Sequence, residues 1–485
     1  MREFLEVIPD PVSLIESMRA VGYSAQTAIA DIIDNSLSAK ASQIKIEYDA
    51  SREPFVSILD NGEGMYANEL TNAMRHGSSN PNDAREINDL GRFGLGLKTA
   101  SLSQCRKLTV VSKKGGQIYA RCWDLDYVQE RNGWFVTIPT KLELEELPLF
   151  KSLVDQEAGT LVVWQLLDKL MSGAYQPQDE MKNRMRDLVD HLSFVFHRFT
   201  EKEDGIDPVD IFINGVKLHP VDPFLTKNSF TQPLEGQRIP VNEVIINVQP
   251  YVLPHMSHLN IDEIQLAGGK DGLRHNQGFY IYRNRRLVIW GTWFRLVPKE
   301  EFYKLTRVKV DIPNTLDHLW SLDIKKSVAY PPDVIRNRLK ELIPHFANTS
   351  RTTITYPGRK QKNISFEPIW VRTEPSHGTF RYDININHPA LLEITNRIDK
   401  DGQQSIQFLM KLIETALPLE SIYSDLCSDR RNDFELEGEL IKQLVEIAKK
   451  LIEIAGINIT EVFNLDPIAR YPQHHNKIIE ELSNE

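Results

Sequence analysis

An apolar stripe at helical spacing, followed by strand-like runs that end in glycine-rich turns, sets the fold of the N-terminal part of the chain. Residues 24–39 place alanine, isoleucine and leucine on one helical face behind Ser24, a residue suited to cap a helix. Strand-like runs follow at 43–50, 54–60, 107–124 and 159–167. One helix and several strands in this order predict an α/β sandwich over residues 1–175.

Beyond this sandwich the pattern predicts three further regions. Residues 176–348 contain a helix, the strand run GFYIYRNRRLVI (278–289) and a second helix near 333–346. Residues 349–388 are basic and rich in Thr, Ser, Pro and Gly, which indicates a linker or an extended arm. Residues 389–485 are predicted to be a helical domain.

The last region carries an apolar stripe on residues 436–455, which is either the core of a helical bundle or a dimer seam. Gly456 follows and is suited to end the helix. The stripe consists of Leu440, Leu444, Ile447, Ala448, Leu451 and Ala455.

The composition of the 485 residues excludes several classes of protein. Hydrophobic residues at 41% and charged residues at 26% describe a folded globular protein, and no apolar run approaches the ~18 residues of a membrane span. A net charge of −10 argues against a protein that coats nucleic acid. The three cysteines form no CxxC pair, which argues against disulfides and a zinc site. We therefore expect a cytoplasmic protein with reduced thiols.

The segment DIIDN (31–35) is the first of three motifs that could carry chemistry. On a helix, Asp31, Asp34 and Asn35 share one face by their spacing. Such a polar triplet beside an apolar stripe is most often only a solvated face.

The second motif, DNGEGM (60–65), follows a strand-like run. Asn-Gly at this place is typical of a hairpin turn. The functional alternative is that Asp60 accepts a hydrogen bond from an exocyclic amine, while Gly62 and Gly64 allow a flat base to approach the backbone.

The third motif, GRFGLGLKT (91–99), resembles a Walker A loop with one extra residue, Leu97, before Lys98. It follows a polar segment rather than a strand, so P-loop geometry is not expected. Glycine-rich backbone that opens a helix can still bind phosphate through free N–H groups, and Lys98 adds a positive charge.

Taken together, these motifs and the later Gly159-Thr160 resemble the GHKL ATPase superfamily, which includes gyrase B, heat-shock-ninety chaperones, histidine kinases and MutL. DNGEGM with GRFGLGLK is most similar to the Microrchidia (MORC) group and its prokaryotic relatives. The resemblance covers residues 20–170 and implies the Bergerat α/β sandwich of these ATPases, with ATP and Mg²⁺ as ligands.

The resemblance also implies roles for single residues. Asn35 is the expected protein ligand of Mg²⁺, which prefers oxygen ligands. Asp31 stands where the family usually has a glutamate general base, so its shorter side chain departs from the family pattern. Asp60, supported by Thr160, is the expected adenine-reading carboxylate, and residues 66–90 are the expected mobile ATP lid. The remaining nucleotide-binding candidates are Gly62, Gly64, Met65, Gly91, Gly94, Leu95, Gly96, Leu97 and Lys98.

Residues 278–293 and 307–327 resemble the transducer domain of these ATPases, a β-α-β domain of ribosomal-protein type. A transducer lysine reaches the γ-phosphate in such enzymes, where it offsets charge that develops during phosphoryl transfer. Lys325 and Lys326 are the two candidates, and the sequence does not separate them.

Basic and aromatic residues alternate over 283–309, and 351–363 adds four basic residues without an acidic one. These stretches could follow a nucleic-acid backbone, or they could be solvated strands or contacts to the ATPase domain.

The resemblance implies an ATP-gated homodimeric clamp with ATPase activity. Prokaryotic relatives often sit beside anti-invader genes, so it further implies antiviral defence or DNA handling, with duplex DNA or a protein encoded nearby as partner and no membrane partner. The alternative is a nucleotide-sensing scaffold with little turnover, which assembles protein partners through residues 388–485. The aspartate at position 31 keeps this alternative open.

Overall fold

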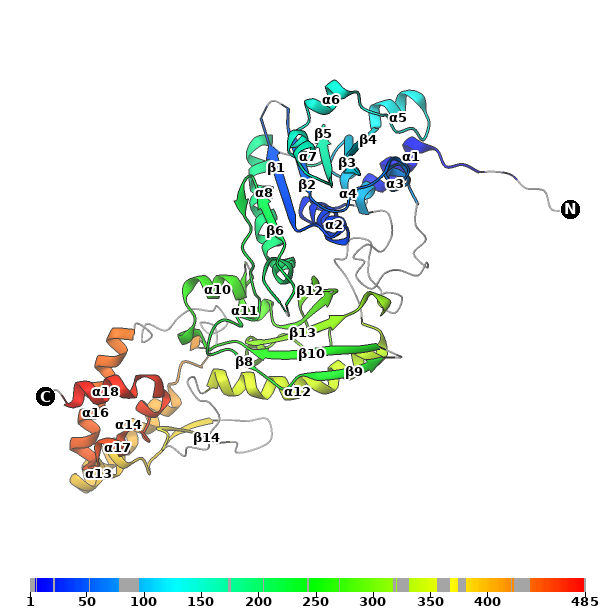
Figure 1. Cartoon of the computed structure of the whole chain (residues 1–485). Helices are drawn as coiled ribbons and strands as arrows, with labels where there is room; N and C mark the ends of the chain where they lie inside the picture. The colour runs from blue at the N-terminus through cyan, green and yellow to red at the C-terminus, as the bar shows by residue number, and fades with distance from the viewer. Residues whose placement is uncertain are drawn as a thin grey trace.

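The structure is a computed structural model that shows two β-sheets with flanking helices and a helical C-terminal unit (Figure 1). It describes residues 5, 7–20, 22–51, 53–77, 96–172, 176–203, 205–241, 244–269, 271–316, 320, 331–355, 367–373, 381–419, 421–422 and 437–483.

The first sheet has the strand order β4-β3-β5-β2-β1-β6-β7. Neighbouring strands are antiparallel except β1 and β6, which run parallel. Its strands are β1 (Gln43–Asp49), β2 (Phe55–Asp60), β3 (Lys107–Lys114), β4 (Gln117–Asp124), β5 (Gly159–Gln165), β6 (Asp210–Ile213) and β7 (Val216–Lys217).

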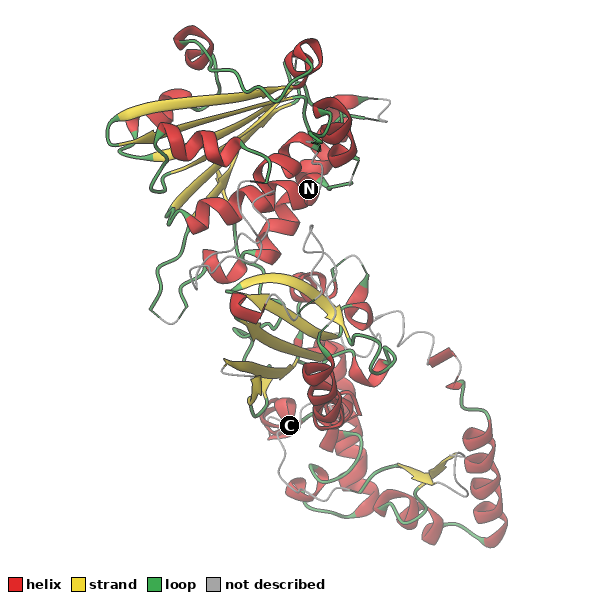
Figure 2. Ribbon diagram, turned by 90° about the vertical axis from the view of Figure 1, so that its right-hand side faces the viewer, coloured by secondary structure: helices red, strands yellow, loops and turns green. Residues whose placement is uncertain are grey.

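Helices cover both faces of this sheet, as Figure 2 shows. They are α1 (Pro11–Arg19), α2 (Ala25–Ser38), α3 (Ala67–Met74), α4 (Gly96–Leu102), α5 (Leu125–Arg131), α6 (Lys141–Glu145), α7 (Phe150–Asp155), α8 (Pro177–Val195) and α9 (His197–Thr200).

Strand β2 lies at the centre and supplies both cores. Val56 and Ile58 enter the larger core with α2, whereas Leu59 points into a smaller core with Leu153 of α7. Because side chains alternate along a strand, a strand that is buried on both faces is apolar at consecutive positions. The predicted α/β sandwich is confirmed.

The first sheet extends past residue 175, where the sequence placed the end of the first domain. Gln43 to Ile46 of β1 pair with Asp210 to Ile213 of β6, and β7 pairs with β6. The structure therefore changes from the first sheet to the second after β7. Pairing between strands so far apart in the chain leaves no local sequence signal.

The second sheet has the order β12-β11-β13-β10-β8, with β9 paired to β10. Strands β11 and β13 are parallel, and β11–β12 is a hairpin. The elements are β8 (Gln232–Pro233), β9 (Gln237–Val241), β10 (Val244–Val252), β11 (Gly278–Arg283), β12 (Arg286–Thr292), β13 (Thr306–Ile312), α10 (Ile261–Gly268), α11 (Gly272–His275) and α12 (Asp333–Thr355), with 3₁₀ turns at Met256–His258, Glu301–Tyr303 and Asn314–Leu316.

Helix α12 packs along the second sheet (Figure 1). Its Ile335, Leu339 and Ile343 share a core with Val308 and Val310 of β13. The i, i+4 and i+8 spacing of the three helix residues places them on one face. A helix predicted near 333–346 is confirmed and is longer than expected.

The C-terminal unit is helical, with one small strand pair. Its elements are β14 (Trp370–Thr373), β15 (Arg381–Ile384), α13 (Pro389–Arg397), α14 (Lys400–Thr415), α16 (Glu437–Ala455), α17 (Ile459–Val462) and α18 (His475–Ser483), with 3₁₀ turns at Ile468–Arg470 and Pro472–His474. Within the described residues, no helix combines the length and apolar character needed to cross a bilayer.

Two predictions about the C-terminal part can now be settled. The stripe on α16 is bundle core, because Leu444 and Ala448 are buried against α17 and α18 residues of the same chain. The region predicted as a linker at 349–388 is partly structured. Glu367 pairs with Leu465, and the backbone N–H of Ile369 donates to Asp466 Oδ2 over 3.1 Å, so these residues pack onto the C-terminal unit.

Candidate functional site

Helix α2 carries the first motif, and its apolar residues fix how it is rotated. Ser24 caps it by accepting from the backbone N–H of Thr27, as predicted. Ile29 and Ile33 are fully buried against the first sheet. Asp31 and Asp34 are also buried, at 5% and 1% exposure, while Asn35 is exposed. The solvated-face explanation is therefore wrong for both aspartates.

Asp60 ends β2 with a buried carboxylate. Its Oδ1 accepts from the backbone N–H groups of Gly62 (2.9 Å) and Thr160 (3.2 Å), and its Oδ2 accepts from Ser36 Oγ (2.8 Å). Burial raises the pKa of Asp60, and the three donated hydrogen bonds oppose that shift. The carboxylate is thus held rigidly at the end of a central strand.

The DNGEGM segment is not a hairpin turn, because β2 ends at Asp60 and α3 follows. Asn61 Oδ1 accepts from the backbone N–H groups of Ser42 and Gln43 and so fixes the start of β1. A Cβ at Gly62 would lie 2.7 Å from the carbonyl oxygen of Ala39, so only glycine allows this close packing on the end of α2.

The hydroxyl group of Ser112 connects two predicted site residues, Met65 and Thr160. Ser112 Oγ accepts from the backbone N–H of Met65 (2.8 Å), donates to the carbonyl of Gly159 (3.1 Å) and lies 3.0 Å from Thr160 Oγ1. Ser112 and Ser36 are site residues that the sequence motifs did not include. Ser36 directly follows the DIIDN motif, which is a usable signal, but nothing in the strand around Ser112 marks it.

Helix α4 begins in the third motif and packs against α2. A Cβ at Gly96 would lie 3.7 Å from Asp31 Oδ2, so the start of α4 faces this carboxylate directly. Leu97 is half-buried, and Lys98 is buried with its Nζ donating to the carbonyl of Ala73. Burial lowers the pKa of Lys98 to about 8. Three predicted residues of this motif lie outside the described residues: Gly91, Gly94 and Leu95.

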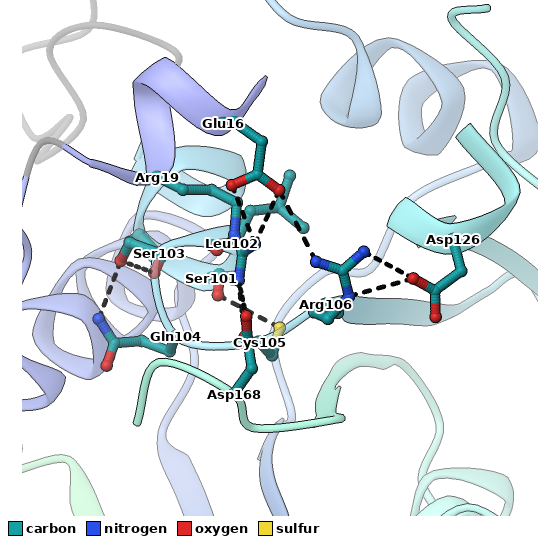
Figure 3. Close-up of polar contacts among 11 residues, drawn as sticks. Glu16, Arg19, Ser101, Leu102, Ser103, Gln104, Cys105, Arg106, Asp126 and Asp168 are labelled. Atoms are coloured by element: carbon teal, nitrogen blue, oxygen red, sulfur yellow. Dashed lines mark hydrogen bonds and ion pairs between the residues drawn. The ribbon is translucent and has the colours of Figure 1, made fainter. Parts of the chain in front are cut away.

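Arg19 of α1 holds the other end of α4. Its Nε donates to the carbonyl of Leu102 over 2.7 Å, and its guanidinium pairs with Asp168 at 2.6 Å and with Glu16 at 3.0 Å. Figure 3 shows Arg19 among these partners. The arginine is 4% exposed, so α1 and the segment after β5 fix the position of the helix that bears Lys98.

Helix α3 occupies the first part of residues 66–90, the segment predicted to be the mobile ATP lid. Leu70 and Met74 are buried, and Trp123 Nε1 donates to the carbonyl of Met74 over 2.9 Å. The two apolar residues are four apart and form one helical face that the sequence analysis overlooked. Residues 78–95 lie outside the described residues.

Four basic residues of the stretch at 283–309 are interior and do not face a nucleic-acid backbone, whereas Arg295 of the same stretch is exposed. Arg283, Arg286, Lys304 and Arg307 are each 5% exposed or less. Several guanidinium groups stack on aromatic rings inside the protein, such as that of Arg307 over Tyr280. One of the predicted alternatives was contact with the ATPase domain. Arg286 makes such a contact, because it pairs with Asp34 of α2.

The arrangement suits a nucleotide with a divalent cation. A carboxylate has about four lone-pair positions, and three donors hold Asp60, so Oδ2 can accept one more hydrogen bond, as from an exocyclic amine. Asn35 offers an exposed amide oxygen of the kind that Mg²⁺ takes. Lys325 and Lys326 lie outside the described residues.

The sandwich, with the three motifs gathered on α2, the end of β2 and the start of α4, defines the first part of the chain as a GHKL-type nucleotide-binding domain. Residues 23–160 match the sequence model of the family described as histidine kinase-, DNA gyrase B-, and HSP90-like ATPase.

Named relatives match within the same domain. ATPase morc-1 of Caenorhabditis elegans is 32% identical over 139 residues, which are 28% of this chain and 16% of that protein. DNA mismatch repair protein MutL of Colwellia psychrerythraea is 34% identical over 131 residues, 26% of this chain and 20% of that protein. MutL of Thermosipho africanus is 30% identical over 93 residues, 19% and 16% of the two chains. The chain therefore spans a fifth or less of these relatives.

Proposed function

We propose that this chain binds Mg-ATP in its N-terminal domain and hydrolyses it. The observation that carries the proposal is the buried carboxylate of Asp60. It is held by Ser36, Gly62 and Thr160, and Ser36 lies on the same helix, α2, that presents Asp31 and Asn35. Within the described part of the chain no cation pairs with this carboxylate. A buried carboxylate in such a place is costly, and an adenine amine would satisfy it.

Each remaining residue has a separate task in this proposal. Asp31 is the general base that accepts the proton of the attacking water, Asn35 supplies an oxygen ligand to Mg²⁺, and Lys98 contributes positive charge to the phosphates. Asp31 faces the start of α4, where backbone N–H groups would meet the phosphates. A carboxylate placed there lies beside the group that reacts.

Steady-state hydrolysis of ATP, measured with and without Mg²⁺, tests this function. We expect Mg²⁺-dependent phosphate release that Asp60→Asn abolishes. Asp49→Asn, which changes an exposed carboxylate at the end of β1, is the matched control and should turn over as the parent does. Binding of ATP without hydrolysis would instead support the scaffold alternative, and absence of binding would overturn both.

We further propose that ATP binding closes a homodimer at the N-termini. Leu5, Val7 and Ile8 are 92%, 87% and 68% exposed, and this segment leaves the domain ahead of α1 (Figure 1). Exposed apolar residues in sequence favour burial against a partner surface. A non-hydrolysable ATP analogue should therefore convert monomer to dimer in light scattering, and Ile8→Glu should prevent this. Leu142→Glu, at a 70% exposed position on α6, is the control.

Duplex DNA is proposed as a ligand because two of the relatives are named DNA mismatch repair proteins. Hydrolysis should then increase when duplex DNA is added at low salt, and the increase should weaken as salt rises, since phosphate contacts release counterions. An unchanged rate at every salt concentration would remove DNA from the proposal.

One observation favours the alternative, a scaffold that assembles protein partners. Helix α14 has no buried residue and exposes Phe408, Leu409, Leu412 and Ile413 on adjacent turns. Phe408→Glu with Leu412→Glu should change which proteins or copies associate with the chain while ATP turnover stays the same. If turnover is absent in the parent and association depends on ATP, the scaffold function replaces the ATPase function.

A further inference from the structure

Arg286, the first residue of β12 in the second sheet, forms a buried ion pair with Asp34 of α2. The distance from Arg286 Nε to Asp34 Oδ1 is 3.0 Å, and the two side chains are 6% and 2% exposed. The residues are 252 positions apart in the chain. The second sheet therefore touches the first motif itself.

The groups around this ion pair shield it from solvent and orient the Arg286 side chain. The Arg286 guanidinium lies 4.5 Å from the centre of the Phe196 ring, and its Nη1 donates to the carbonyl of Leu287. His191 of α8 lies nearby, in ring contact with Trp290 of β12 at 6.1 Å. Burial lowers the pKa of His191 to about 3, the charge of Arg286 acts in the same direction, and that of Asp34 opposes them. His191 is therefore neutral at physiological pH, so the charge that pairs with Asp34 in this contact is that of Arg286.

The turn of α2 that Arg286 reaches is the turn on which the proposed nucleotide site depends. Asp34 directly precedes the Mg²⁺ candidate Asn35 and lies one turn after Asp31, which faces Gly96. Ser36 on the same turn donates to Asp60. Residues 31–36 span only about 7.5 Å of helix, so a small rotation of α2 at Asp34 moves all of these groups together.

A buried ion pair is a poor means of stabilising a fold. Removing two charges from water costs about as much as their attraction returns, and apolar residues of similar size would usually hold two elements together as well. What the pair provides is a directional link, because the hydrogen bond from Arg286 Nε to Asp34 Oδ1 forms only within a narrow range of distance and angle.

We propose that Arg286 is a positioning residue for ATP turnover, which holds the α2 turn in register through Asp34 and so links the second sheet to the nucleotide site. This inference rests on the proposed ATPase function. Misplacing a reacting group by about 1 Å can cost a hundredfold in rate without loss of binding. The pair should therefore affect the chemical step more than nucleotide affinity.

The test compares kcat, KM and the affinity for a non-hydrolysable ATP analogue in four variants. Arg286→Gln and Asp34→Asn should each lower kcat by roughly 10- to 100-fold and change analogue affinity by less than about threefold. The double variant should be no worse than about threefold below either single one, because residues that act as a unit are not additive. Arg286→Lys, which retains the charge, should recover part of the rate.

Arg285→Gln is the matched control. Arg285 is the neighbouring residue and pairs with Glu203 rather than with α2. The Arg285→Gln variant should lower the thermal midpoint of unfolding about as much as Arg286→Gln does, but its kcat should stay within about twofold of the parent value. If Arg286→Gln also lowers only the thermal midpoint, or if the losses of the two single variants multiply in the double variant, the positioning role is overturned and the ATPase function stands. If the parent itself does not hydrolyse ATP, the proposed function fails and this inference fails with it.

Discussion

Lys98 donates its ammonium to the carbonyl of Ala73 across 2.9 Å, so the lysine of the glycine-rich motif holds the last turn of α3 in this structure. A cation near the C-terminus of a helix is favourable because it meets unpaired carbonyl groups. The same ammonium is the charge that we assign to the phosphates. Phosphate binding would therefore compete with the contact to α3.

This relationship predicts a pH dependence of ATP binding. Burial lowers the pKa of Lys98 from 10.5 to about 8, so the side chain loses its charge as the pH rises through 8. The apparent Kd for ATP should rise about fivefold between pH 8 and pH 9 and change little below pH 7. Lys98→Met should bind ATP more weakly and without this dependence, as measured by calorimetry. Lys141→Met, at an exposed position on α6, should follow the parent curve.

The unliganded protein gives a second check on the same group. Because the folded pKa of Lys98 is below its value in the unfolded chain, the unfolded state binds more protons between pH 8 and pH 10.5. The contribution of Lys98 therefore makes the free energy of unfolding rise with pH across this window. In denaturant titrations, the free energy of unfolding of the parent, relative to that of Lys98→Met, should therefore rise between pH 8 and pH 10.5. A difference that is constant with pH would contradict the lowered pKa.

Asp60→Asn should abolish ATP binding while the protein remains folded. The amide nitrogen cannot accept the hydrogen bonds that the carboxylate accepts, and it would present a donor to the adenine amine, at a cost of roughly 1–3 kcal/mol or more. Ser36→Ala removes only one supporting hydrogen bond to Oδ2 and should weaken ATP binding by less. Equal affinities of the parent and Asp60→Asn in calorimetry would remove Asp60 from adenine recognition.

Gly64→Ala should destabilise the N-terminal domain and weaken ATP binding. Gly64 has φ +66°, and a Cβ there would overlap the carbonyl of Lys113 on β3. Gly116, with φ +73° and no atom within 4 Å of a Cβ, controls for backbone strain alone. Gly116→Ala should cost about 1–2 kcal/mol in urea titrations, and Gly64→Ala clearly more, since it adds a collision to the same strain. Equal losses of unfolding free energy in the two variants would mean that β3 moves away from the added Cβ at no energetic cost.

The sequence was most informative where structure and chemistry are local. The apolar spacing of residues 24–39 predicted α2 and its Ser24 cap, and the strand runs predicted β1 to β5. The motifs indicated Asp31 and Asp60, and both are buried. Asp31 faces the start of α4, and Asp60 lies at the end of β2. Short periodic segments and turn residues are read directly from neighbouring positions.

The parts that sequence reasoning missed depend on contacts between distant segments. Strand β6 joins β1 across more than 160 positions, and Arg286 reaches Asp34 across 252. The stretch at 283–309 has the composition of a nucleic-acid surface, but Arg286 and Arg307 are satisfied by carbonyl groups, a carboxylate and aromatic rings in the interior. Composition alone cannot distinguish an exposed arginine from one that is buried and paired.

Replacement of Asp31 separates nucleotide binding from chemistry. Asp31→Ala should keep Mg-ATP affinity within a few-fold and lower turnover by roughly 10²–10⁴, the range for loss of a general base. Asp31→Glu introduces the residue that is usual at this position in the superfamily. This variant should hydrolyse ATP at least about 100-fold faster than Asp31→Ala. Asn35→Ala should instead remove the Mg²⁺ dependence of binding. Normal hydrolysis by Asp31→Ala would show that another residue is the base.

The two lysines predicted as candidates for contact with the γ-phosphate, Lys325 and Lys326, should not be equivalent. Neighbouring side chains in a strand or extended loop point in opposite directions, so only one of them can reach the nucleotide. Alanine at that lysine should lower kcat strongly and weaken ADP binding little, because ADP lacks the group that is contacted.

The comparison needs both single variants and the double variant, each measured for ATP turnover and for ADP affinity. The lysine that does not reach the phosphate serves as the matched control for its neighbour, since it removes the same charge from the adjacent position. The double variant should match the more damaging single one, because the second lysine adds nothing to the transition state. Parental turnover in all three variants would mean that neither lysine senses the γ-phosphate, whereas the contact of Arg286 with Asp34 would still connect the second sheet to α2.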